Sequence, residues 1–224
     1  MLTIDTPEFQ RDLLWWSPMN PVLIPLIDTS LRDAVTSLWQ LDHAMIRILR
    51  TVKEPALRQI RLAWWRDSVL RLGNESAQNE PTLQALSQHV VSHITPLKLA
   101  ELLDLWEDVM ISEPDQTDVV ERFAAVYGPA FWSVTAAITG YHDIQYGTAA
   151  ARFIITRHAV ICAQSGPVQS ALFQIASATG GALSPRNPRF LRALDRLSLR
   201  VAGKQGHRNY GAEQLTLLRA TIFG

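Results

Sequence analysis

At 224 residues the chain fits one domain that is large enough to bury a sizeable core. Apolar residues make up 47% and charged residues 19% of it, which excludes a disordered chain. The 21 basic and 21 acidic residues cancel, so the overall charge does not favour nucleic acid, and we expect no nucleic-acid partner.

The N-terminal segment predicts an extended lead-in without an export signal. Asp5 and Glu8 precede any apolar run, unlike the basic and then apolar start of a signal peptide. Three prolines interrupt residues 17–30, so we predict extended chain over residues 1–29. The lone cysteine, Cys162, forms no internal disulfide, which favours a reducing compartment and a cytoplasmic location.

Helical spacing of apolar residues begins after this lead-in. Ser30 is predicted to cap a helix of about 20 residues, and Pro55 opens a second helix near 55–72. We find no sustained period-two alternation and no hairpin signal, so we predict an all-α bundle of eight or nine helices in a single domain over residues 1–224. Further helices are predicted at 82–93, 97–111, 117–140, 146–164, 167–179, 188–202 and 211–222.

One stretch approaches the length of a membrane span. Residues 123–141 carry no charge, but they include Gly128, Pro129 and five alanines. Such a composition disfavours insertion into lipid relative to Leu or Ile. We therefore predict a buried core helix here.

Two ionisable side chains are predicted to point into the bundle. Asp42 lies eleven residues after Leu31, about three helical turns, and so falls on the apolar stripe of its helix. Arg61 lies between two apolar sides of the next helix, both of which are predicted to be covered by neighbours. Because an unpaired buried ion is costly, we predict an Asp42–Arg61 ion pair that either fixes helix register or borders an internal cavity.

Other patterns of ionisable residues fit structural roles better than chemistry. His89 and His93 have the spacing of zinc ligands on a helix but lack a third ligand. Residues 101–121 hold eight acids and no Lys or Arg, which is typical of a solvated face. Apolar neighbours predict that Cys162 is a buried small residue rather than a nucleophile.

The segment near 188–202 predicts an amphipathic helix with a basic face. Its apolar side carries Phe190, Leu194, Leu197 and Val201. This pattern fits an anionic membrane surface, which would make the protein peripheral to a membrane, an acidic protein face, or an ordinary solvated face. The basic side is formed by Arg189, Arg192, Arg196 and Arg200.

The segment from Ala34 to Leu70 has at its centre the sequence SLWQLDHAMIRILRTVKEPALRQIRLAWWRDSVL, and the stretches LLDLWEDVMI and FAAVYGPAFWSVTAAITG follow it. This segment resembles the N-terminal helices of the squalene/phytoene synthase family, and the later stretches are similar to that family in order and spacing. The resemblance implies an all-α isoprenoid-synthase fold around a central cavity. In active members, two facing helices each present an acidic DxxxD-type motif that binds Mg²⁺ and the diphosphates of two prenyl substrates.

This sequence departs from the family pattern at both acidic motifs. The first motif falls on residues 46–50, where Ile46 and Arg50 stand in place of two aspartates. The second motif falls near GTAAARFIITRH, where Ile154 and His158 occupy the expected ligand positions. We therefore assign no catalytic residue and no metal ligand, and we expect no cofactor.

These departures leave three functional hypotheses. The leading one is a non-catalytic binding or assembly factor, similar to the branch of the family that includes a mitochondrial complex I assembly factor. The others are an active prenyltransferase that uses Mg²⁺, and a carrier of isoprenoid or lipid. Expected partners are a protein, an anionic membrane surface, or an isoprenoid or diphosphate ligand, and the candidate cavity residues are Asp42, Arg50 and Arg61.

Overall fold

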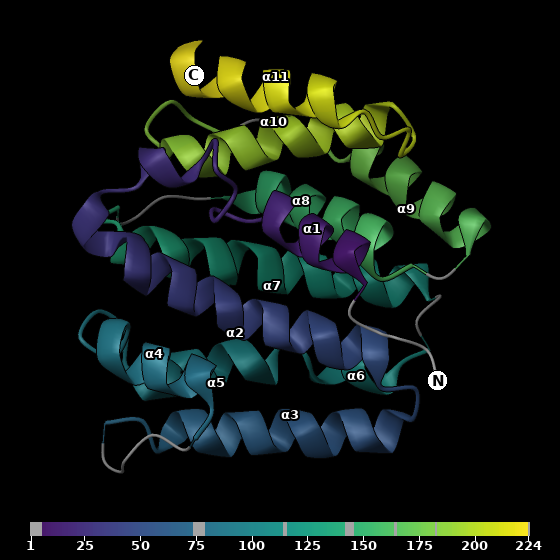
Figure 1. Cartoon of the computed structure of the whole chain (residues 1–224). Helices are drawn as coiled ribbons and strands as arrows, with labels where there is room; N and C mark the ends of the chain where they lie inside the picture. The colour runs from purple at the N-terminus through teal and green to yellow at the C-terminus, as the bar shows by residue number, and fades with distance from the viewer. Residues whose placement is uncertain are drawn as a thin grey trace.

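The computed structural model of the chain describes residues 6–73, 79–113, 116–141, 146–163, 165–181 and 183–223. These residues form helices and turns without a β-strand, so the predicted all-α class is confirmed (Figure 1). The helices are stacked from α3 at one end of the molecule to α11 at the other. They are α1 (Pro7–Trp15), α2 (Arg32–Thr51), α3 (Pro55–Leu70), α4 (Pro81–His89), α5 (Pro96–Asp104), α6 (Glu107–Ile111), α7 (Thr117–Ile138), α8 (Gly147–Ile161), α9 (Gly166–Ala178), α10 (Arg189–Gly203) and α11 (Tyr210–Phe223), with the short 3₁₀ helices η1 (Ile24–Leu26) and η2 (Thr29–Leu31).

The predicted extended lead-in over residues 1–29 is wrong for residues 7–15, which form α1. The Thr6 hydroxyl accepts a hydrogen bond from the Phe9 amide at 3.2 Å, and Pro7 occupies the first turn. Phe9 and Leu13, one turn apart, are buried against the bundle. A single apolar pair after a cap is too short a periodic pattern to distinguish a helix from extended chain.

Other helix boundaries also differ from the sequence prediction: the helix predicted over 82–93, for example, ends at His89. Ser30 does not cap α2, because Asp28 instead accepts a hydrogen bond from the Ser30 amide and caps η2. The helix predicted over 97–111 is divided into α5 and α6. The break turns the Trp106 ring into the core, where its centroid lies 4.7 Å from that of Phe123.

The outer side of α3 is exposed, which corrects the prediction that two sides of this helix are covered. Leu62, Trp65 and Val69 are buried against the neighbouring helices. Ile60 is 64% exposed and Trp64 41% exposed on the other side. Because α3 is the last helix at its end of the stack, no described element lies beyond it (Figure 1). The spacing of apolar residues predicted both apolar stripes of α3, but it could not show which stripe packs against a neighbouring helix.

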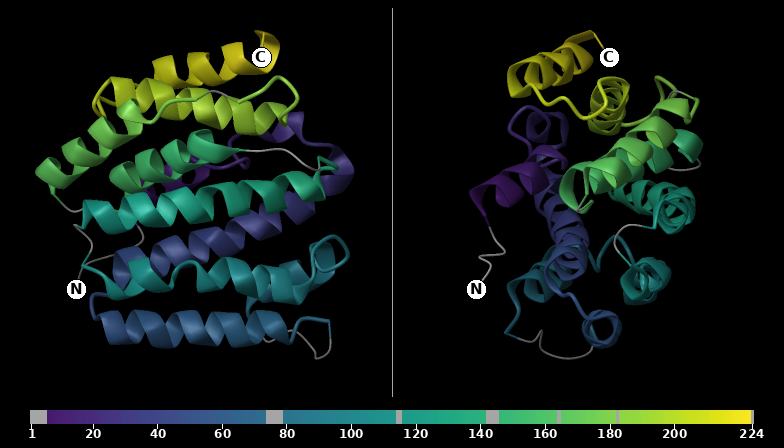
Figure 2. Two further views of the ribbon diagram at one scale, coloured as in Figure 1. Left: turned by 180° about the vertical axis from the view of Figure 1, so that it is seen from behind. Right: turned by 90° about the vertical axis from the view of Figure 1, so that its right-hand side faces the viewer.

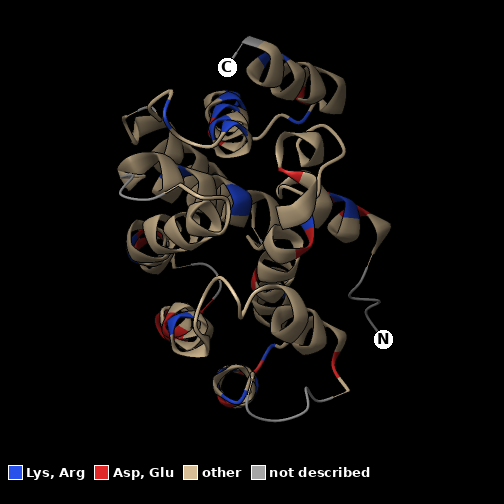
Figure 3. Cartoon of the chain, turned by 90° about the vertical axis from the view of Figure 1, so that its left-hand side faces the viewer, with Lys and Arg blue, Asp and Glu red and all other residues tan. Residues whose placement is uncertain are grey.

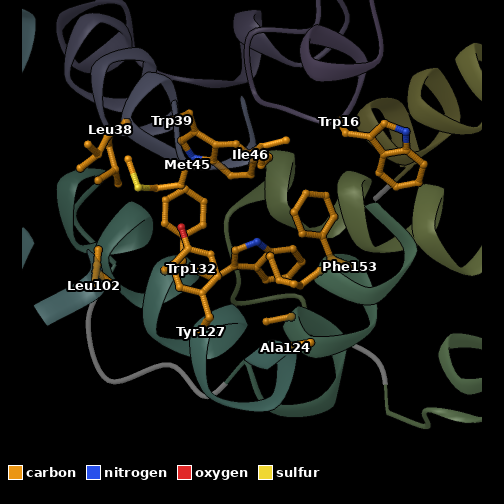
Figure 4. Packing of buried hydrophobic residues seen from close by; sticks show 14 of the residues in the cluster. Trp16, Leu38, Trp39, Met45, Ile46, Leu102, Ala124, Tyr127, Trp132 and Phe153 are labelled. Atoms are coloured by element: carbon orange, nitrogen blue, oxygen red, sulfur yellow. The ribbon is translucent and has the colours of Figure 1, made fainter. Parts of the chain in front are cut away.

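The centre of the bundle is formed by α2, α7 and α8. Figure 4 shows Trp39 of α2 facing Trp132 of α7 and Phe153 of α8. The ring of Phe153 lies 5.9 Å from that of Trp39 and 5.3 Å from that of Trp132. The predicted burial of residues 123–141 is confirmed for most of α7, where one face of the helix remains exposed. Among the described residues, none of the helices combines the length and apolar character needed to cross a membrane.

Candidate functional site

Asp42 is the acid at the centre of the bundle, and it has two partners there. Only 2% of its surface is exposed. Arg157 of α8 donates two hydrogen bonds to it, from Nη1 to Oδ2 at 2.6 Å and from Nη2 to Oδ1 at 3.1 Å. The Tyr127 hydroxyl of α7 donates a third, to Oδ1 at 2.6 Å. The carboxylate therefore connects three helices through charge-assisted hydrogen bonds.

The predicted Asp42–Arg61 pair does not form. Asp42 points inward as predicted, but Arg61 is exposed to solvent on α3. The cation that pairs with Asp42 is instead Arg157, which lies 115 residues after Asp42 in the chain. A signal for this partner was present in the sequence, because Arg152 and Arg157 are the only charged residues in the otherwise apolar α8. A cation within such a helix predicts a buried anion on a neighbouring helix.

Burial near Asp42 keeps the Tyr127 phenol and the Cys162 thiol uncharged. Burial, reinforced by the negative charge of Asp42, raises the pKa of the Tyr127 phenol well above its ordinary value. Tyr127 therefore stays protonated and acts as a hydrogen-bond donor. Burial also raises the pKa of the Cys162 thiol to about 12, which fits the predicted inert, buried cysteine.

The positions of the two expected acidic motifs do face each other across the interior. Ile46 of α2 and Ile154 and His158 of α8 line one interior space, together with Arg157 and Cys162. This space has a volume of about 10 Å³, which is roughly the room that one water molecule needs. The central cavity that the resemblance implies is therefore closed at this point by side chains.

None of the three candidate cavity residues lines this space, although Asp42 is paired with Arg157, which does. Arg50, one turn after Ile46, is exposed, and its charge acts on the Cys162 thiol from the edge of the bundle. Arg61 lies on the exposed side of α3. Of the three residues predicted to line a ligand cavity, the structure places only Asp42 in the interior.

A larger hollow lies on the surface between α3, α5 and α6. Its volume is about 580 Å³, and it is bordered by an ion pair in which the Arg66 Nε lies 2.5 Å from Asp104 Oδ1. Leu62 and Ala63 of α3 form its apolar part. This groove is separate from the interior space around Asp42.

The comparison with known families gives one match. Residues 17–117 match the squalene/phytoene synthase family model. The matched segment contains Asp42, Ile46 and Arg50 and ends at the first residue of α7, so it covers the first acidic motif and not the second. No curated protein and no solved structure matches the chain. The match supports the resemblance that the sequence analysis found in the N-terminal half.

The residues at the family's metal positions do not fit Mg²⁺. This ion takes oxygen ligands, usually carboxylates, whereas Ile46, Ile154 and His158 offer none. Both carboxylate oxygens of Asp42 already accept hydrogen bonds from Arg157 or Tyr127. In the part of the chain that the structure describes, no three His, Cys, Asp or Glu residues are grouped to hold a metal ion. We derive no metal-dependent step for this protein.

Replacing Asp42 by alanine is expected to destabilise the fold. The change leaves the buried Arg157 guanidinium without its anion, which costs about 3–5 kcal/mol in the free energy of unfolding. Arg61→Ala serves as the control, because Arg61 is exposed and its loss should change stability by less than about 0.5 kcal/mol. Urea denaturation of both variants measures the difference. A small loss for Asp42→Ala would show that the pair does not form.

Acid is expected to destabilise the protein through His43. This buried imidazole adjoins Asp42 in the chain, and its Nε2 has no hydrogen-bond partner among the described residues. Burial lowers the pKa of His43 to about 4, although the charge of Asp42 opposes this change. Between about pH 6.5 and about pH 4 the unfolded chain therefore binds a proton that the folded chain does not. Stability should fall by about 3 kcal/mol over this interval as the pH decreases.

Urea unfolding midpoints across this pH range test the assignment. His43→Leu should remove most of the decrease, because leucine cannot bind a proton. His93→Leu is the matched control. Because His93 is exposed, this variant should lose stability with falling pH as the parent protein does. If His43→Leu lost stability with acid as steeply as the parent protein, another group would be responsible.

Proposed function

We propose that this squalene/phytoene synthase-like protein does not condense prenyl diphosphates and acts instead as a binding or assembly factor. The observation that carries the proposal is the closed interior, about 10 Å³, at the point where the two expected motifs face each other. Pockets that bind small molecules usually have volumes of about 300–1,000 Å³. Two prenyl chains have no room there.

The charges at this point also argue against catalysis. Two prenyl diphosphates bring several negative charges together, and the family resemblance implies that carboxylate-bound Mg²⁺ offsets them. Ile46 and Ile154 provide neither charge nor metal ligand. The nearby acid on α2, Asp42, is neutralised by Arg157. A prenyltransferase that used this interior would need a different set of ligands.

The surface supports a binding role better than the interior supports a carrier role. The outer side of α3 leaves Leu57, Ile60 and Trp64 in contact with solvent, at the i, i+3 and i+7 positions of one helix face. Contiguous apolar surface of this kind is typical of protein interaction sites. An isoprenoid or lipid carrier would instead need an apolar interior space, and the space lined by Ile46 and Ile154 is too small.

Turnover measurements test the loss of activity. The purified protein is incubated with farnesyl diphosphate or geranylgeranyl diphosphate and Mg²⁺, and squalene, phytoene and released pyrophosphate are measured. We expect no product above a heat-treated control, because the interior offers neither volume nor metal ligands. Turnover that disappears in Asp42→Asn would contradict the proposal and would support an active prenyltransferase.

A further inference from the structure

The basic face predicted on α10 is present, and the acid on this helix does not neutralise it. Phe190, Leu194 and Leu197 are buried against the bundle. Asp195 is buried with them, and its Oδ1 lies 2.5 Å from Nη2 of the buried Arg152. The exposed side of the helix therefore carries cations without an adjacent acid. Figure 3 shows Lys and Arg concentrated on α10.

On α11, too, the acid is buried and paired while a basic residue is exposed. Glu213 is the one other acid in residues 183–223, and it is buried and paired with Arg208 at 2.8 Å. Burial and the repulsion of Arg189 and Arg196 lower the pKa of Arg192. Seven basic residues of this region are exposed or half-buried and form no ion pair with a described residue: Arg186, Arg189, Arg192, Arg196, Arg200, Lys204 and Arg219.

Apolar side chains are also exposed on α10 and α11. Helix α11 lies along α10 at one end of the molecule (Figures 1 and 2). Leu215, Leu218 and Ile222 follow one another at i, i+3 and i+7 along α11 and are 47%, 40% and 64% exposed. Leu199 is 42% exposed on α10. Exposed cations and exposed apolar side chains thus both occur on α10 and α11, two adjacent helices at one end of the stack.

The acidic part of the chain lies away from this end. The described acids between residues 101 and 121 are on α5, α6, α7 and the turn before α7, and all of them are exposed. Three of these acids are paired, Glu101 with Lys98, Asp104 with Arg66 and Asp118 with Arg122, whereas the exposed cations of α10 have no acid beside them. A negatively charged surface would attract the α10–α11 end and repel the exposed acids of α5 and α6.

We propose that the α10–α11 surface docks onto an anionic lipid membrane. From Arg189 to Lys204 the cations extend over about 22 Å of helix, which suits a flat array of lipid phosphates. Leucine and isoleucine side chains can enter the region between headgroups and acyl chains while the arginines stay at the phosphates. An acidic protein would pair with the arginines but would leave the apolar row of α11 without a role.

Vesicle co-sedimentation of the whole chain tests the proposal. The protein should bind vesicles of phosphatidylcholine with phosphatidylglycerol and should bind phosphatidylcholine alone much more weakly. Arg189→Glu/Arg196→Glu should weaken binding more than about tenfold, because each basic residue near an anionic surface contributes several-fold to affinity. Lys53→Glu/Arg61→Glu, with the same change in charge on exposed residues near α3, should bind like the parent protein.

Two further experiments separate the contribution of charge to membrane binding from that of apolar contact. Raising the salt concentration from about 0.1 M to about 1 M shortens the screening length from about 10 Å to about 3 Å and should weaken the initial attraction. Leu215→Ser/Leu218→Ser should reduce the binding that remains at high salt. Binding to soluble poly-glutamate but not to the anionic vesicles would overturn the proposal in favour of an acidic protein partner. Equal weakening by both double charge reversals would overturn it as well.

Discussion

The ion pair between Asp42 and Arg157 is the interaction on which the interior of this protein depends. Its two charges come from α2 and α8, and Tyr127 adds a hydrogen bond from α7 between them. Replacing such a pair by apolar residues is often neutral, whereas removing one partner is costly, so the pair acts mainly to fix which residues face each other. The register it fixes brings Ile46 opposite Ile154.

That register bears on how a family resemblance could be combined with the proposed loss of prenyl transfer. Residues 17–117 match the squalene/phytoene synthase family model. Helices α2 and α8 bring the two expected motif positions together. The residues at those positions leave a space of about 10 Å³ between them. The proposed binding role therefore rests on the surface: the exposed apolar side chains of α3, and the exposed basic and apolar side chains of α10 and α11. These helices lie at opposite ends of the stack (Figure 2).

Periodicity predicted those elements whose two faces differ strongly in polarity. Helix α10 was predicted within about one residue because its arginines and apolar residues alternate with a clear helical period. The inward position of Asp42 followed from the same reasoning. The partner of Asp42 did not, because spacing along one helix carries no information about which distant helix packs against it. The exposure of the outer side of α3 was missed for the same reason.

The proposed loss of prenyl transfer requires that the interior space between Ile46 and Ile154 binds no diphosphate with the help of Mg²⁺. Isothermal titration with farnesyl thiodiphosphate, a non-reactive substrate analogue, measures this directly when performed with and without Mg²⁺. The closed space of about 10 Å³ and the lack of carboxylate ligands predict no saturable heat that depends on Mg²⁺. Saturable binding that requires Mg²⁺ and is lost in Asp42→Asn would contradict the account.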